Sequence, residues 1–186
     1  MPQQNTPLYD ALVKPKDIFR IPLKEAEKLQ FSCIKHAFIH NYNNNKFYHK
    51  FCKERTVTPD DIKTNEDLLK IPLIPDKFFK DYPSGKDFAL WLANIYTGEV
   101  PNITIRQKNP SYDDVIKAFY EAGIIVSYSS GTGGRYTFIP RNKQTFLNAE
   151  YALAKTVVTM AYPLWKHDSY GYLLMPNPKK NFIFAG

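Results

Sequence analysis

The amino-acid sequence predicts an α/β fold in which N-terminal helices are followed by a mixed sheet with flanking helices. Apolar residues recur at helical spacing over residues 23–40, 111–122 and 143–160. Between the last two patterns lies a run of β-branched residues, Ile124–Val126, which is typical of a buried strand. Helices that alternate with strands in this way favour an α/β domain.

The elements before residue 71 are expected to be helical. A helix over residues 23–40 ends at an asparagine-rich segment, 41–45, and a short aromatic helix follows over residues 47–53. Thr58–Asp61 combines a hydroxyl, a proline and two carboxylates, which is the signature of a helix start. Thr64–Asp67 repeats that chemistry one step later.

The next part of the chain is expected to supply extended segments that lead into the sheet. Pro72 and Pro75 prevent a continuous helix, and Asp76 can begin a short helix after them. The apolar pattern over residues 88–96 fits either a strand or a short helix, and periodicity does not decide between them. Residues 103–106 are interpreted as a strand.

We expect a mainly helical region over residues 1–110 and an α/β segment over residues 111–186, together forming one incomplete structural unit. In the second region Ser111 is expected to cap a helix and Gly123 to end it. The strands expected there cover residues 124–128, 138–140, 170–175 and 182–185, with the helix 143–160 between the second and the third.

The net charge of +7 would suit an anionic partner. The basic residues are, however, spread along the chain rather than gathered in one run. No RNA-binding signature accompanies the aromatic residues, although these make up 15% of the chain. We therefore assign most of the excess charge to solvated surface, with a local contribution to nucleotide phosphate binding, and do not favour a nucleic-acid partner.

The N-terminus lacks the basic start and apolar core of a signal peptide, and no apolar stretch approaches the roughly 18 residues of a membrane helix. The two cysteines, Cys33 and Cys52, lie in apolar, helix-like segments. They are expected to be small buried residues rather than a disulfide or nucleophiles. These features predict a soluble, cytoplasmic protein with no membrane partner.

The sharpest functional signal is a glycine-rich loop directly after the strand 124–128. Its residues are Ser129, Ser130, Gly131, Thr132, Gly133, Gly134 and Arg135. Glycines let backbone N–H groups converge on anionic oxygens, hydroxyls add donors, and an arginine charge suits phosphate. The loop is therefore a candidate nucleotide-phosphate site. No catalytic residue and no metal ligand is assigned.

The same loop can also be an ordinary surface turn between the strands 124–128 and 138–140, because glycine-rich turns are common. It is not a Walker loop, since no Gly-Lys-Ser/Thr closes it. Its glycine spacing also differs from that of the dinucleotide-binding fingerprint.

Ser129–Thr137 resembles the Ser/Thr/Gly-rich phosphate loop of the adenylate-forming (AMP-binding) superfamily. The usual pattern there is Ser-Gly-Thr-Thr-Gly; here Gly133 replaces the second threonine, and Tyr136–Thr137 stands where many members have Pro-Lys. Residues 43–52 and 71–80 are similar to the acyl-protein synthetases, the fatty-acid ligases that serve bacterial luminescence, in their Asn/Tyr segment, Ile-Pro-x-x-Pro element and Phe-Phe-Lys. Phenylacetate-CoA ligases are the next nearest family.

The resemblance implies a ligase that uses ATP, usually with Mg²⁺, to form an acyl-adenylate from a carboxylic acid and then passes the acyl group to a protein or CoA thiol. It also implies that the loop holds the β- and γ-phosphates, with Ser130, Thr132 and Arg135 as side-chain ligands. The family's adenine contacts, metal ligand and late catalytic residues lie well beyond this loop. We therefore expect an N-terminal segment of such an enzyme that is inactive alone: a fragment, a split-gene product that a downstream chain could complete, or a degenerate remnant.

Two other function classes stay open: a basic module that binds RNA or another polyanion, and a non-catalytic partner subunit whose unfinished sheet docks onto a second chain. Two weaker site candidates have simpler explanations. His36 and His40 lie one helical turn apart, as metal ligands can, but ordinary helix positions account for them. The pairs Asp60–Asp61 and Asp113–Asp114 are explained by the helix starts they occupy.

Overall fold

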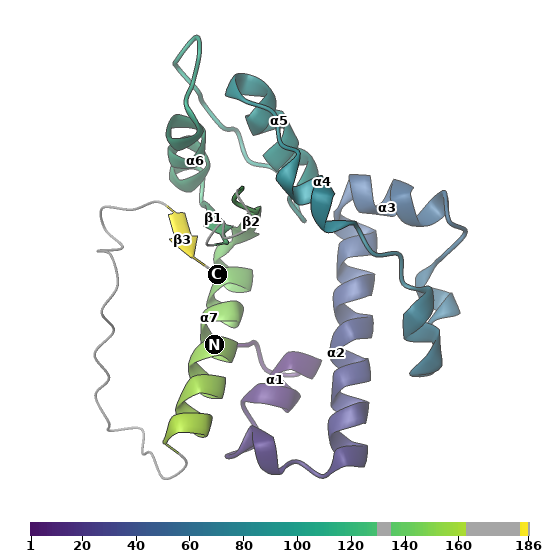
Figure 1. Ribbon diagram of the computed structural model, residues 1–186. Helices are drawn as coiled ribbons and strands as arrows, with labels where there is room; N and C mark the ends of the chain where they lie inside the picture. The colour runs from purple at the N-terminus through teal and green to yellow at the C-terminus, as the bar shows by residue number, and fades with distance from the viewer. Residues whose placement is uncertain (130–134, 163–182, 186) are drawn as a thin grey trace. The chain divides into compact units, whose positions relative to one another are not determined.

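The computed structural model describes residues 1–129, 135–162 and 183–185 (Figure 1). The α-helices are α1 (Pro7–Leu12), α2 (Leu23–Asn44), α3 (Lys46–Lys53), α4 (Asp76–Lys80), α5 (Gly85–Ile95), α6 (Tyr112–Glu121) and α7 (Lys143–Ala161). Short 3-10 helices cover Ile18–Arg20, Pro59–Asp61 and Glu66–Lys70. The strands are β1 (Ile124–Tyr128), β2 (Phe138–Asn142) and β3 (Ile183–Ala185). This mixed content, mostly helical, confirms the α/β class predicted from the sequence.

The described residues divide into two compact units that interleave along the chain. The first comprises residues 1–40, 59–71 and 144–162. The second comprises residues 41–58, 72–129, 135–143 and 183–185. The sheet and both ends of the glycine-rich loop belong to the second unit.

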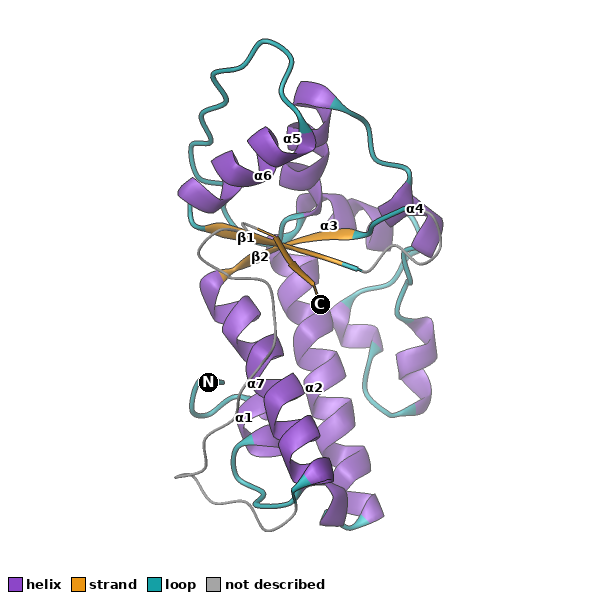
Figure 2. Cartoon of the chain, turned by 60° about the vertical axis from the view of Figure 1, so that its left-hand side comes forward, coloured by secondary structure: helices purple, strands orange, loops and turns teal. Residues whose placement is uncertain are grey.

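The sheet of the second unit has the strand order β2-β1-β3. β1 and β2 are antiparallel, with Tyr128 opposite Phe138, whereas β1 and β3 are parallel, with Ser127 opposite Phe184. Helices α5 and α6 pack against β2 and β1, and Figure 2 shows both helices on the same side of the sheet. The return strand predicted over residues 138–140 is confirmed and continues to Asn142.

The core of this unit forms where α5 and α6 cover the sheet. Phe88 and Leu92 of α5, Val115 and Phe119 of α6, and Val126 of β1 belong to one cluster and have no exposed surface. Removing such a side chain from water contributes about 1.5–3 kcal/mol. The β1–β2 hairpin, which the glycine-rich loop connects, is therefore held by close packing against α5 and α6.

Helix α6 forms where its local signals predict it. The Ser111 side chain accepts a hydrogen bond from the Asp114 N–H, and the Asp114 carboxylate accepts from the Ser111 N–H at 2.9 Å, which completes a capping box. Gly123 follows the helix with a φ of +87°, a conformation that glycine adopts without strain. The predicted cap and stop are both confirmed.

The asparagine-rich segment does not interrupt α2 as predicted; the helix runs on to Asn44, and the break comes at Asn45. Distant partners stabilise this last turn. The Gly98 N–H donates to the Asn44 carbonyl at 3.0 Å, and the Thr97 hydroxyl donates to the Asn41 side chain at 2.7 Å. Asparagine is therefore tolerated here because its polar groups are satisfied from 50 or more residues away.

Two assignments between residues 85 and 110 are decided by the structure. Residues 88–95 of the undecided pattern belong to helix α5, and Tyr96 is its C-cap. The strand predicted over residues 103–106 is absent, which corrects that prediction. Ile103 and Ile105 instead pack singly against the core from an irregular segment, so burial alone explains their apolar character.

Helix α7 confirms the helix predicted over residues 143–160. The apolar face noted in the sequence is partly exposed in the structure: Leu153, Val157 and Met160 have exposed fractions of 60%, 46% and 68%. The strand predicted over residues 170–175 lies outside the described residues. The strand predicted over residues 182–185 appears as β3, with Phe182 outside the described part.

Candidate functional site

The glycine-rich loop leaves β1 after Tyr128 and returns to β2 at Phe138, so its ends are opposite positions of one hairpin. The Ser129 N–H donates to the Thr137 carbonyl at 3.1 Å, and the Thr137 N–H donates to the Ser129 hydroxyl at 3.1 Å. These two bonds close the base of the loop. Residues 130–134, which carry the remaining hydroxyls and the three glycines of the predicted site, lie outside the described residues.

Arg135, at the exit of the loop, is the other predicted phosphate ligand within the described part. One terminal guanidinium nitrogen donates to the Lys80 carbonyl at 3.0 Å and lies 3.7 Å from the Asp81 carboxylate. The guanidinium carbon lies 5.9 Å from the centroid of the Tyr82 ring. Three consecutive residues thus lie beside the guanidinium, and we name Lys80, Asp81 and Tyr82 the 80–82 bracket.

Tyr82 connects the bracket to the core. Its ring packs edge-on against Phe138 at 5.0 Å and against Tyr112 at 5.6 Å between centroids. Burial and the neighbouring Tyr112 raise the pKa of Tyr82, while Arg135 and the Tyr136 backbone oppose that rise. The bracket is therefore held firmly at one end, beside the return strand.

Arg135 lies where the glycine-rich loop returns toward β2, and its charge is not buried. The Arg135 side chain is 60% exposed, so its guanidinium can meet a ligand from solvent. A guanidinium binds phosphate and carboxylate through paired N–H groups. In the described part of the chain, the nitrogen facing Lys80 and Asp81 is the one with a polar partner, which leaves the other donors for such a ligand.

The sequence did not indicate the bracket. The segment 71–80 was singled out for its prolines and its Phe-Phe-Lys, and Asp76 does begin the short helix α4. The contact with Arg135, however, uses a backbone carbonyl, which carries no residue signature. No local signal joins Lys80 to Arg135, which lies 55 residues later in the chain.

The weaker candidates gain no support as chemical sites. In the described ranges no group of three or more His, Cys, Asp or Glu side chains could hold a metal ion, and this includes the surroundings of His36 and His40. Asp114 is engaged in the capping box of α6. Asp60 and Asp61 lie in a 3-10 helix.

The two cysteines are free and lie in helices. Cys52 has no exposed surface, which confirms its predicted burial, whereas Cys33 is only half-buried. Burial raises the pKa of both thiols. A raised pKa lowers the thiolate fraction at neutral pH, so neither cysteine has the character of a nucleophile.

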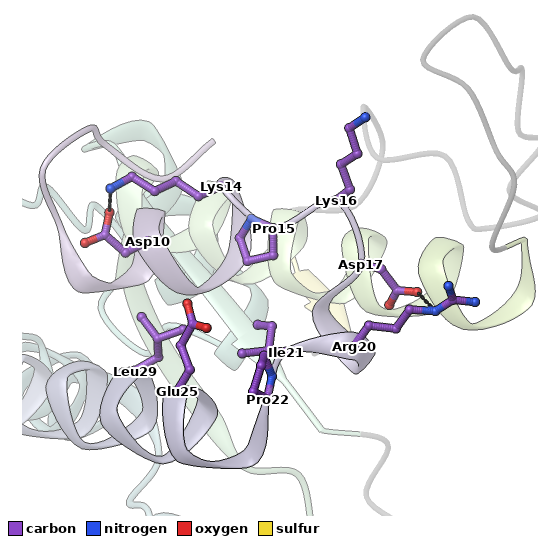
Figure 3. Close-up of a pocket in the computed structure, with 10 residues that line it drawn as sticks. All are labelled: Asp10, Lys14, Pro15, Lys16, Asp17, Arg20, Ile21, Pro22, Glu25 and Leu29. Atoms are coloured by element: carbon purple, nitrogen blue, oxygen red, sulfur yellow. Dashed lines mark ion pairs between the residues drawn. The ribbon is translucent and has the colours of Figure 1, made fainter.

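A separate cavity of about 610 Å³ lies in the first unit (Figure 3). Its lining residues are Asp10, Lys14, Pro15, Lys16, Asp17, Arg20, Ile21, Pro22, Glu25 and Leu29. Two ion pairs, Lys14–Asp10 at 2.8 Å and Arg20–Asp17 at 3.2 Å, neutralise much of its charge (Figure 3). None of the residues predicted for phosphate binding lies there.

No protein-family model, no curated protein and no solved structure matches this chain. In the part of the chain that the structure describes, none of the helices is both long enough and apolar enough to span a lipid bilayer.

Proposed function

We propose that this chain is the N-terminal segment of an ATP-dependent, acyl-activating enzyme of the adenylate-forming type, most similar to the acyl-protein synthetases. One observation supports this most directly. A Ser/Gly-rich loop follows a buried strand, is closed at its base by Ser129 and Thr137, and carries Arg135 at its exit. The return strand β2 then leads directly into a long helix, α7.

The proposed chemistry begins with a carboxylic acid. Its carboxylate oxygen attacks the α-phosphorus of ATP, the bond to the bridging oxygen breaks, and the products are an acyl-adenylate and pyrophosphate. Negative charge builds on the leaving pyrophosphate, and preorganised donors around the β- and γ-phosphates stabilise it. A thiol of CoA or of a protein then takes the acyl group and releases AMP.

In this scheme the chain supplies the groups that bind the β- and γ-phosphates of ATP. The backbone N–H groups of Gly131, Gly133 and Gly134 and the side chains of Ser130, Thr132 and Arg135 are the proposed ligands. Mg²⁺, which such enzymes use, would screen the phosphate charge.

Calorimetric titration of the chain with pyrophosphate and with Mg-ATP tests the proposal. We expect binding that weakens at least several-fold in Thr132→Ala and in Arg135→Ala. Arg106→Ala is the matched control, because it removes the same charge from an exposed irregular segment. Heat release with an RNA oligonucleotide, but with neither pyrophosphate nor Mg-ATP, would favour the polyanion-binding alternative and contradict the proposal.

A further inference from the structure

The carboxylate of Asp81 lies on the same guanidinium nitrogen that the Lys80 carbonyl occupies, 3.7 Å from it. A carboxylate is an anion, as is the phosphate that we propose for Arg135. Both anions seek the same N–H donors, and each repels the other. Asp81 therefore competes with the proposed ligand for Arg135 from within the same chain.

The contacts of Asp81 are loose enough to be exchanged. Its side chain is 56% exposed, and its other cation, Lys77, is 3.9 Å away. By contrast, Lys80 is paired closely with Asp76, at 2.6 Å. Exposed ion pairs at such long distances contribute little to stability, so a ligand can displace Asp81 without unfolding its surroundings.

The rest of the bracket holds Arg135 in place when Asp81 is displaced. The Lys80 carbonyl accepts from the guanidinium at 3.0 Å, and the Tyr82 ring lies beside it while packed into the core. A side chain already held in one place loses less conformational entropy when it binds a ligand. Lys80 and Tyr82 therefore hold Arg135 in position for a ligand, whereas Asp81 offsets part of its positive charge.

We propose that Asp81 regulates anion binding by competing with phosphate for the positive charge of Arg135, so that this carboxylate weakens the binding of an anion to the guanidinium. The inference rests on the proposed function, since it assigns phosphate as the ligand of Arg135. It adds a residue that sets the affinity of the site from outside the glycine-rich loop.

The test is a double-mutant cycle read out by pyrophosphate titration of the full chain. Asp81→Asn keeps the shape of the side chain and removes its charge. We expect it to tighten pyrophosphate binding about two- to fivefold, the range that corresponds to an exposed ion pair. In an Arg135→Ala background the same substitution should tighten binding clearly less, because the competition for Arg135 is then gone and only direct repulsion between the two anions is relieved.

Two controls separate the mechanism from a general gain of positive charge. Asp81→Glu, which keeps the carboxylate, should bind more like the unchanged chain than Asp81→Asn does. Asp87→Asn removes an exposed carboxylate from the first turn of α5 and should leave the affinity unchanged. Far-UV circular dichroism of every variant checks that the fold is kept.

The outcomes distinguish the two proposals. If neither the unchanged chain nor Asp81→Asn binds pyrophosphate, both the proposed function and the inference are wrong. If the chain binds and Arg135→Ala weakens binding, but Asp81→Asn has no effect or weakens it, only the competition is overturned. Equal tightening with and without Arg135 also overturns the competition and leaves the proposed function standing.

Discussion

Ser129 and Thr137 exchange two hydrogen bonds across the base of the glycine-rich loop, one from each backbone N–H, both at 3.1 Å. The Ser129 hydroxyl is the acceptor in one of them. A residue predicted from the sequence as a phosphate ligand therefore has a structural task at the point where the loop joins the sheet. This pair determines how the hairpin meets its loop.

Ser129→Ala is expected to destabilise the protein by about 1 kcal/mol, because the half-buried Thr137 N–H loses its side-chain acceptor. Urea denaturation followed by circular dichroism measures the change. Ser129→Thr keeps the hydroxyl and should recover most of the stability. An alanine variant as stable as the unchanged chain would show that the bond contributes nothing in solution.

Asn45→Ala is expected to cost about 2–3 kcal/mol, because the buried amide of Asn45 has two tasks. Its oxygen caps α3 by accepting from the Tyr48 N–H at 2.8 Å, and its nitrogen donates to the Ile95 carbonyl at 3.1 Å and the Tyr96 carbonyl at 3.3 Å. Thermal unfolding measures the loss.

Asn45→Asp tests the two tasks of that amide separately. Aspartate keeps the helix cap but turns a donor that faces two carbonyls into an acceptor. We therefore expect Asn45→Asp to be no more stable than Asn45→Ala at neutral pH. If aspartate restored full stability, the bonds to Ile95 and Tyr96 would have no energetic role.

Ser111→Ala should destabilise α6 by about 1 kcal/mol, the usual cost of losing a helix cap. Ser111→Asp keeps a capping oxygen but places a second carboxylate beside Asp114, so it should recover only part of the stability. Chemical denaturation of the three proteins gives the order. The prediction fails if alanine and serine are equally stable.

Stability is expected to fall in acid partly through Asp67. Its carboxylate accepts from the Lys70 ammonium at 2.7 Å and from the N–H groups of Lys63 and Thr64, both at 2.8 Å. The Lys70 hydrogen bond, followed by the two backbone bonds, holds the pKa of Asp67 well below its usual range. The contribution is therefore complete above the unfolded-state pKa of about 3.9 and disappears as the pH falls through the lower folded-state pKa.

Asp67→Asn removes that titration. We expect the slope of unfolding free energy against pH to become flatter below about pH 4, where the unfolded chain binds the proton that the folded chain does not. Denaturation at a series of pH values measures the slope.

The sequence was informative where the deciding interactions are local. Ser111, Asp114 and Gly123 mark the two ends of α6 through contacts within one or two turns, and the predicted helix agrees with the structure. The β-branched run before the loop likewise predicted β1. In these segments propensity, capping and burial all favour the same conformation.

The sequence-based predictions were wrong, or made no assignment, where contacts with residues far away in the chain determine the local structure. The end of α2 was placed too early because its last carbonyl is satisfied by Gly98, which the local pattern does not reveal. Ile103 and Ile105 alternate as in a strand, yet single contacts with the core account for both. The 80–82 bracket was missed for a related reason, since its main contact with Arg135 is a backbone carbonyl.

The ring cluster around Tyr82 also gives the protein an optical reporter. The indole of Trp91 lies 5.8 Å from the Tyr82 ring and stacks on Phe88 at 5.9 Å. Tyr82 in turn lies beside the guanidinium of Arg135. Indole emission depends on the rings and charges around it, so replacing Trp165, the chain's second tryptophan, by phenylalanine would leave Trp91 as the single tryptophan. Its quenching or spectral shift would follow rearrangements around it in real time.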